Sequence, residues 1–106
     1  MFQDIEAALK ETLRLYPSAS AITVHSLQDT TLAGKYNIPK NQVFMLLLFL
    51  LHRDPKVWGD DAEQFKPERM LPEAFAKLPP HAWKPFGNGE RACIGRPFAM
   101  QVTEWE

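Results

Sequence analysis

The sequence predicts a mainly α-helical fold with a small β component, and three observations lead to this prediction. Apolar residues recur at helical spacing at the start of the chain, a β-branched run follows the first proline, and a second amphipathic stretch closes the chain. The 106 residues allow one domain at most. The 12 basic and 13 acidic residues nearly cancel, which gives no reason to expect a nucleic acid as partner.

The first predicted element is a helix over residues 2–15, in which apolar side chains recur every three or four positions until Pro17 ends the pattern. A short strand is expected over 19–25, where Ile, Thr and Val are adjacent, and a hairpin over 28–39. The apolar run 43–51 does not alternate with polar residues. We therefore expect it to begin as a strand and to end as a helical turn.

The second half of the chain is expected to be less regular. Residues 54–61 predict a turn followed by an aspartate-capped short helix to Phe65. Prolines and glycines predict a long segment with little regular structure over 66–92. Its aromatic residues indicate that the segment is packed, and we expect the surface on which it packs to lie outside this chain. A final helix is predicted to open near 95–97 and to run to the end.

The only cysteine, Cys93, lies in a loop with three glycines. A single cysteine excludes an internal disulfide and a multi-cysteine metal site, so the thiol is either an inert buried group or individually important. The glycines allow the backbone to approach a flat ligand, Arg91 can neutralise an acid group, and the next helix directs its positive end at the thiol. These neighbours favour a metal-binding thiolate.

Histidines offer fewer candidates. His25, His52 and His81 share no metal-ligand spacing and are expected to be surface or hydrogen-bonded residues. A nucleophilic pair of Cys93 with His81 is conceivable, but no third group is available to orient the histidine. The metal-binding loop is therefore the preferred interpretation.

The loop resembles a known signature through Phe86, Gly87, Gly89, Arg91, Cys93 and Gly95. This pattern is similar to the haem-binding signature of the cytochromes P-450, the haem-thiolate monooxygenases. The resemblance implies haem b as cofactor and Cys93 as the proximal iron ligand, whose electron donation favours O–O cleavage. It further implies that Phe86 shields the sulfur and that Arg91 pairs with a haem propionate, with Gly95 completing the cofactor-binding loop.

Two charged motifs extend the resemblance. On the first helix, Glu11 and Arg14 lie nearly opposite the apolar stripe, and this pattern alone favours a solvent-exposed pair worth roughly 0.2–0.5 kcal/mol. The family carries a Glu-x-x-Arg pair at this place, which implies instead that the pair is packed against the irregular segment. Arg69, in the sequence Pro-Glu-Arg-Met, would then complete a structural cluster with it. An ordinary charged turn is the alternative for Arg69.

The strand after Pro17 would line the pocket above the haem in this family. Ala19, Ser20 and Ala21 could therefore contact the substrate, with a plain surface strand as the alternative. The motifs follow the family's order over residues 1–106, which we interpret as part of a haem domain, from the Glu-x-x-Arg helix to the start of the last long helix.

The combination of residues 58–61 with 81–87 is most similar to the self-sufficient fatty-acid hydroxylases. The implied reaction inserts one oxygen atom of O₂ into a small apolar substrate, such as a fatty acid. Electrons would come from NADPH through the FAD and FMN of a flavin reductase, in cis or in trans.

The family's domain is several times longer than this chain, so we expect a C-terminal fragment that is inactive on its own. The alternatives are a non-enzymatic haem binder, a poorly folded remnant, or a small interaction module in which the thiol is inert. The longest apolar run is far below the roughly 20 residues of a membrane-spanning helix, and the start lacks a secretory signal. A cytoplasmic location is expected, and a membrane anchor upstream stays open.

Overall fold

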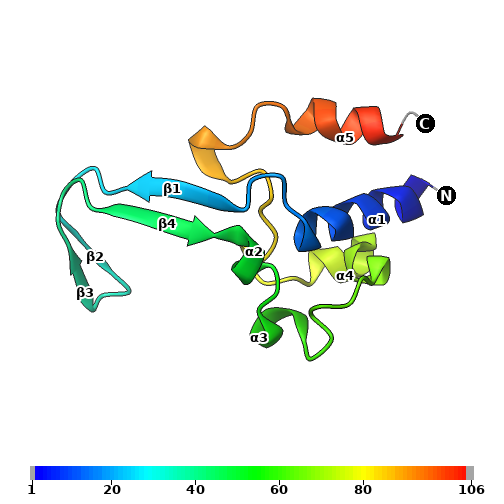
Figure 1. The fold of residues 1–106 in the computed structure, drawn as a ribbon, viewed down its shortest axis with the longest axis horizontal. Helices are drawn as coiled ribbons and strands as arrows, with labels where there is room; N and C mark the ends of the chain where they lie inside the picture. The colour runs from blue at the N-terminus through cyan, green and yellow to red at the C-terminus, as the bar shows by residue number, and fades with distance from the viewer. Residues whose placement is uncertain (1, 105–106) are drawn as a thin grey trace.

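The computed structural model describes residues 2–104. Its elements, in chain order, are α1 (Phe2–Leu15), β1 (Ala21–His25), β2 (Thr30–Leu32), β3 (Tyr36–Ile38), β4 (Val43–Leu47), α2 (Leu48–Leu51), α3 (Pro55–Trp58), the 3₁₀ helix η1 (Pro67–Met70), α4 (Pro72–Ala76), the 3₁₀ helix η2 (Gly89–Arg91) and α5 (Arg96–Glu104) (Figure 1). The fold is mainly α-helical with a small β component, as predicted. None of the helices in this range is long and apolar enough to cross a membrane.

The strands form two antiparallel pairs that extend away from the helices. β1 pairs with β4, so that Ala21 lies opposite Leu47 and His25 lies opposite Val43, and β2 pairs with β3 in the expected hairpin. Figure 1 shows the strand pairs as an arm on one side of the helical part. β4 continues directly into α2, which confirms the predicted change from strand to helix within residues 43–51.

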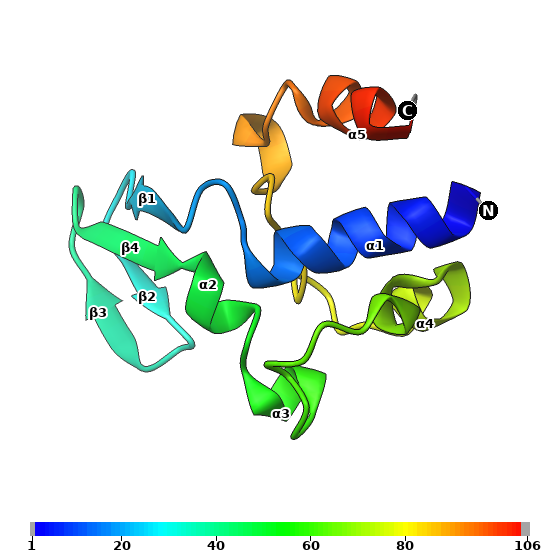
Figure 2. The same ribbon diagram turned by 45° about the vertical axis from the view of Figure 1, so that its right-hand side comes forward.

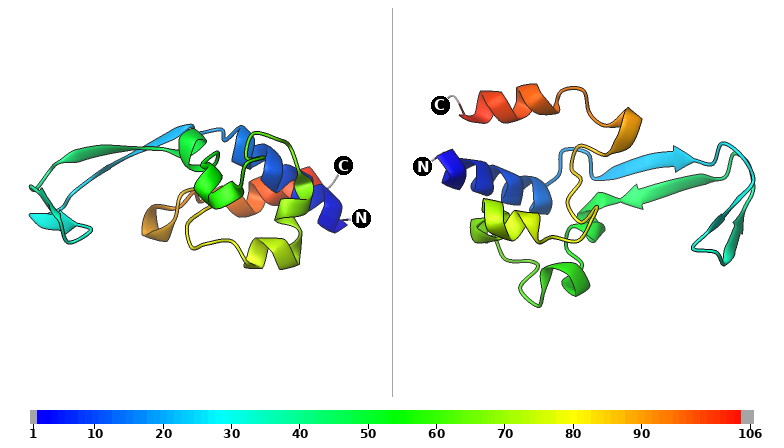
Figure 3. Two further views of the ribbon diagram at one scale, coloured as in Figure 1. Left: turned by 90° about the horizontal axis from the view of Figure 1, so that it is seen from below. Right: turned by 180° about the vertical axis from the view of Figure 1, so that it is seen from behind.

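α1 lies at the centre of the helical part. In Figures 1 and 2, α5 lies along one side of α1, and α4 lies on its other side. The view from behind shows the same order (Figure 3). The predicted helices near both ends of the chain are therefore confirmed over the described residues, and they are neighbours in space although about 80 residues separate them in the sequence. The predicted continuation of the last helix over residues 105–106 lies outside the described residues.

A small apolar core lies between α1, α3, η1 and the segment that follows α4. Its buried members are Ala7, Trp58, Ala62, Met70 and Ala82. Phe75 and Trp83 of the irregular segment pack against it, with ring centroids 5.4 Å apart in an edge-to-face arrangement. The expectation that this segment packs on a surface outside the chain is therefore wrong for these two aromatic residues.

Two expectations for the second half of the chain are also wrong. Residues 66–92 contain η1, α4 and η2, so they hold more regular structure than their prolines and glycines suggested. The short helix to Phe65 does not form, and the aspartate cap belongs to α3, where Asp54 accepts a hydrogen bond from the Lys56 backbone. Residues 60–64 form turns instead, because two arginines bind the carbonyl groups of Asp61, Ala62 and Gln64.

Candidate functional site

A fully buried ion pair occupies the face of α1 that the apolar pattern assigned to solvent. Glu11 and Arg14 are each 0% exposed, whereas Phe2 and Ile5 of the apolar stripe are 67% and 40% exposed. Glu11 Oε2 accepts a hydrogen bond from Arg14 Nε at 2.7 Å, and Oε1 accepts one from Nη2 at 2.8 Å. The exposed pair expected from periodicity is therefore wrong, and the pair is packed as the family resemblance implied.

The guanidinium of Arg14 also binds the chain on either side of α3. Nη1 donates to the carbonyl oxygens of His52 and Ala62 at 2.8 and 2.7 Å, and Nη2 donates to that of Gln64 at 3.1 Å. Together with the two bonds to Glu11, these contacts use the full donor capacity of the guanidinium. A buried arginine whose donors are all occupied can keep its charge inside the fold.

Arg69 joins this cluster from η1. Its Nη1 donates to the Trp58 carbonyl at 2.9 Å, its Nη2 lies 2.8 Å from Asp61 Oδ1, and its Nε lies 3.4 Å from Glu11 Oε1. The pKa of Asp61 is lowered to about 2, mainly by a hydrogen bond from Lys66 and to a smaller extent by one from Arg69, so this carboxylate stays ionised. The structure thus brings Glu11, Arg14 and Arg69 together, as the resemblance implied.

The loop that carries Cys93 begins beside the apolar core and turns sharply. Gly87 and Gly89 both have a φ of +70°, a left-handed conformation that favours glycine. The turn is closed by the Cys93 backbone, which donates to the Phe86 carbonyl at 2.8 Å. The Phe86 ring packs edge-to-face on Trp83, with centroids 6.3 Å apart, so the start of the loop is anchored to the core.

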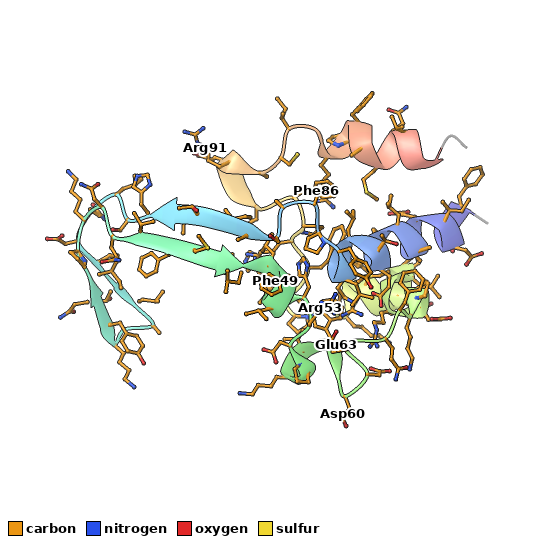
Figure 4. The ribbon with its side chains drawn as sticks, viewed as in Figure 1. Phe49, Arg53, Asp60, Glu63, Phe86 and Arg91 are labelled. Carbon is orange, nitrogen blue, oxygen red and sulfur yellow. The ribbon has the colours of Figure 1, made fainter. Side chains whose placement is uncertain are left out.

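A cavity of about 440 Å³ opens between this loop and the strands. Its wall is mostly apolar and is formed by Leu13, Ser18, Ala19, Ile22, Val24, Leu46, Pro85, Phe86, Gly87, Asn88, Arg91 and Cys93. Figure 4 shows Phe86 and Arg91 on the loop, with Arg91 extending away from the body of the molecule. Phe86, Arg91 and Cys93, three of the residues that the sequence singled out, therefore meet at one concave surface.

The predicted substrate contacts are only partly placed on this surface. Ala19 lines the cavity, but Ser20 and Ala21 are not among the lining residues. Instead, Ile22 and Val24 of β1 line it, and Leu46, which pairs with Ile22 across the two strands, does so too. Alternate residues of a strand share one face, so the lining positions of β1 are 22 and 24. The hydrophobic residues of the strand were the signal that sequence reasoning overlooked.

The cavity and loop suit a haem group bound through sulfur. The thiol of Cys93 is exposed, and Gly95 lies beside it, since a Cβ added at Gly95 would be 3.7 Å from Sγ. Arg91 is an exposed cation on the cavity wall and makes no hydrogen bond or ion pair within residues 2–104. A haem bound through sulfur needs a cysteine side chain, an apolar surface and a positive charge for its acid groups, and the residues of this cavity could supply each of these. The alternative nucleophile partner, His81, does not line the cavity.

The sequence matches a known family of proteins. A comparison with models of protein families matches residues 5–104 to the family described as Cytochrome P450. The match covers nearly the whole sequence. The chain therefore belongs to the cytochrome P450 family.

Individual proteins of this family are similar to the chain over most of its length. The chain is 53% identical over 100 residues to a self-sufficient cytochrome P450 monooxygenase of Oidiodendron maius, covering 94% of this chain and 9% of that protein. It is 59% identical over 104 residues to a bifunctional cytochrome P450/NADPH–P450 reductase of Aspergillus oryzae, covering 92% and 9%. A bifunctional protein of the same description from Alternaria alternata is 55% identical over 97 residues, with the same coverage. The chain thus spans less than a tenth of the length of these relatives.

Proposed function

We propose that this chain supplies the thiolate side of the haem site of a monooxygenase, with Cys93 as the iron ligand. The observation that carries the proposal is the cavity of about 440 Å³, whose wall joins Cys93 and Arg91 to an apolar strand face. A bound haem-thiolate group would supply the activation of O₂. The protein part of the task is to hold the sulfur in place, to neutralise acid groups and to exclude water.

Each residue of the loop has a distinct part in this proposal. Cys93 would bind the iron, and Phe86, which is packed on Trp83, would shield the sulfur from water. Arg91 would pair with an acid group of the porphyrin. The buried cluster of Glu11, Arg14 and Arg69 is connected to the start of the loop through His52, which contacts the Arg14 carbonyl and the Lys84 backbone, and it would keep that part of the chain rigid.

The whole protein's reaction would be the insertion of one oxygen atom of O₂ into an apolar organic substrate. Ala19, Ile22 and Val24 make the strand side of the cavity apolar, which supports a substrate with a hydrocarbon chain, such as a fatty acid. The relatives from Aspergillus oryzae and Alternaria alternata are described as bifunctional cytochrome P450/NADPH–P450 reductases, which supports NADPH and a flavin reductase as the electron source.

The test uses a chimaera in which residues 1–106 replace the matching segment of the Oidiodendron maius relative. The chimaera is loaded with haem, reduced, and exposed to carbon monoxide. We expect the absorption spectrum of a thiolate-bound iron and NADPH-dependent oxidation of a fatty acid. Cys93→Ala should lose the thiolate spectrum, while His81→Ala should keep it.

An imidazole-type spectrum in the parent chimaera, or an unchanged spectrum in Cys93→Ala, would show that Cys93 is not the ligand. Haem binding and turnover by the isolated 106-residue chain should be absent or weak, because the remaining wall of the pocket would come from the rest of the chimaera. Fatty-acid turnover by the isolated chain with added reductase would contradict this division of roles.

A further inference from the structure

A buried histidine connects the charged cluster to the cysteine loop. His52, which was expected to be a surface or hydrogen-bonded residue, follows α2 and is 0% exposed. Its side chain contacts two distant segments, because Nδ1 lies 3.2 Å from the Arg14 carbonyl and Nε2 accepts a hydrogen bond from the Lys84 backbone at 3.1 Å. Its own carbonyl accepts from Arg14 Nη1 at 2.8 Å. Arg14 and His52 are thus bonded to each other twice.

The hydrogen-bond partners determine the form of the ring. A carbonyl oxygen can only accept, so Nδ1 must carry the hydrogen that reaches Arg14. The Lys84 N–H can only donate, so Nε2 must be unprotonated. The pKa of His52 is lowered from 6.5 to about 4, chiefly because the ring is buried. The hydrogen bond to the Arg14 carbonyl acts in the opposite direction, and the charges of Arg14 and Lys84 add to the lowering. The neighbouring Arg53 is directed elsewhere, to Leu15 and Glu63.

Lys84 is the point at which this contact reaches the cysteine loop. Its N–H is held by His52, and its carbonyl accepts from the Gly87 backbone at 3.1 Å. Two residues later, the Phe86 carbonyl accepts from the Cys93 backbone. A short series of hydrogen bonds therefore leads from the carbonyl of Arg14, through His52 and Lys84, to the turn that presents the thiol.

We propose that His52 is a positioning residue that fixes the start of the cysteine loop by bridging the carbonyl of Arg14 and the backbone N–H of Lys84 in its Nδ1–H form. The consequence for the iron ligand rests on the proposed function, whereas the bridge itself concerns the chain alone. Protonation of Nε2 would place two N–H groups against each other and would release Lys84.

The test measures amide hydrogen exchange of Lys84 in the full chain, with His52→Ala, His52→Gln and the exposed His25→Gln as a control. In His52→Ala we expect the Lys84 amide to exchange about tenfold faster, the effect of one lost net hydrogen bond, with the β1–β4 amides unchanged. Glutamine can both donate and accept, so His52→Gln should restore most of the protection. Exchange of Lys84 at the parent rate in His52→Ala would overturn the proposal.

The pH dependence of Lys84 amide protection distinguishes a positioning role of His52 from a purely structural one. Protection of Lys84 in the parent chain should fall as the pH drops through about 4, while His52→Gln should show no such step. A parent profile without the step would also overturn the proposal.

The haem-loaded chimaera provides an independent measurement. There, His52→Ala should shift iron from the thiolate-bound to another form more readily on acidification than His25→Gln does. Equal behaviour of these two variants would count against the positioning role. An unchanged spectrum in Cys93→Ala would instead refute the haem proposal, since the exchange experiment contains no haem.

Discussion

Replacement of Glu11 by alanine should remove a large share of the stability of the fold. Glu11 is 0% exposed and accepts from Arg14 Nε and Nη2 and from the Lys66 backbone, at 2.7, 2.8 and 2.9 Å. In Glu11→Ala the guanidinium stays buried without its counter-charge, a change that costs about 3–5 kcal/mol. Because a domain is typically stable by only about 5–15 kcal/mol, the loss is a large share of the total.

The same helix supplies a matched control. Glu6 pairs with Lys10 at 2.7 Å, but its side chain is 40% exposed, so Glu6→Ala should cost no more than about 0.5 kcal/mol. Urea denaturation followed by circular dichroism measures both free energies of unfolding. In the chimaera, Glu11→Ala and Arg14→Ala should also abolish haem incorporation, and Glu6→Ala should not. Losses of similar size in Glu11→Ala and Glu6→Ala, or normal haem loading of Glu11→Ala, would refute the reasoning.

Three further predictions test other parts of the structure. Arg69→Ala should lower the free energy of unfolding by about 2–3 kcal/mol in the same denaturation assay, because it leaves the Trp58 and Asp61 carbonyls without their charged donor. An unchanged urea midpoint would contradict this prediction. Gly87→Ala and Gly34→Ala should each lower the free energy of unfolding by about 1–2 kcal/mol, because both glycines have a left-handed φ, which is +64° at Gly34. Only Gly87→Ala should also weaken haem binding in a titration of the chimaera, since its Cβ would lie at the cavity, 3.7 Å from Ile22. When the pH is lowered from 7 to 4, the free energy of unfolding should fall by about 3 kcal/mol more in the parent than in His52→Gln. The reason is that the histidine binds its proton near pH 6.5 in the unfolded chain and only near pH 4 in the folded chain. Parallel curves of unfolding free energy against pH for the two proteins would contradict this prediction.

Local signals in the sequence predicted where the elements lie. α1 was predicted with its observed bounds because its helical spacing is clear and Pro17 lies just beyond it. A change from strand to helix within residues 43–51 was also predicted, and it occurs between Leu47 and Leu48. Such features depend on neighbours within a few residues, which the sequence displays directly.

Which face of an element is buried depends on distant partners, and the periodicity of the sequence did not predict it for α1. The polar side of α1 is buried because the carbonyls of Ala62 and Gln64, about 50 residues away, accept hydrogen bonds from Arg14. The same bonds keep residues 60–64 from forming the expected helix. Only the family resemblance pointed to the buried pair, since hydrophobicity alone treats a satisfied ion pair as surface.

In the candidate site, too, the sequence predicted local features and missed those that depend on distant parts of the chain. The sequence identified the loop residues Phe86, Arg91 and Cys93, because glycine, arginine and cysteine at fixed spacing are a local pattern. It missed the role of His52, whose partner at Lys84 is a backbone N–H and leaves no trace in side-chain identity. Of the three positions that it assigned to the substrate side, only Ala19 lines the cavity, and it missed Ile22 and Val24, because the register of β1 with β4 decides which alternate residues face inward.

The most direct test of the central claim is X-ray absorption at the iron of the haem-loaded chimaera. This measurement identifies the elements bound to the metal, and we expect one sulfur ligand in the parent chimaera that disappears in Cys93→Ala. Arg91→Ala should keep the sulfur, because Arg91 is assigned to an acid group of the porphyrin and not to the metal. An iron surrounded only by nitrogen and oxygen in the parent chimaera, or a sulfur signal that survives in Cys93→Ala, would contradict the assignment of Cys93 as the ligand.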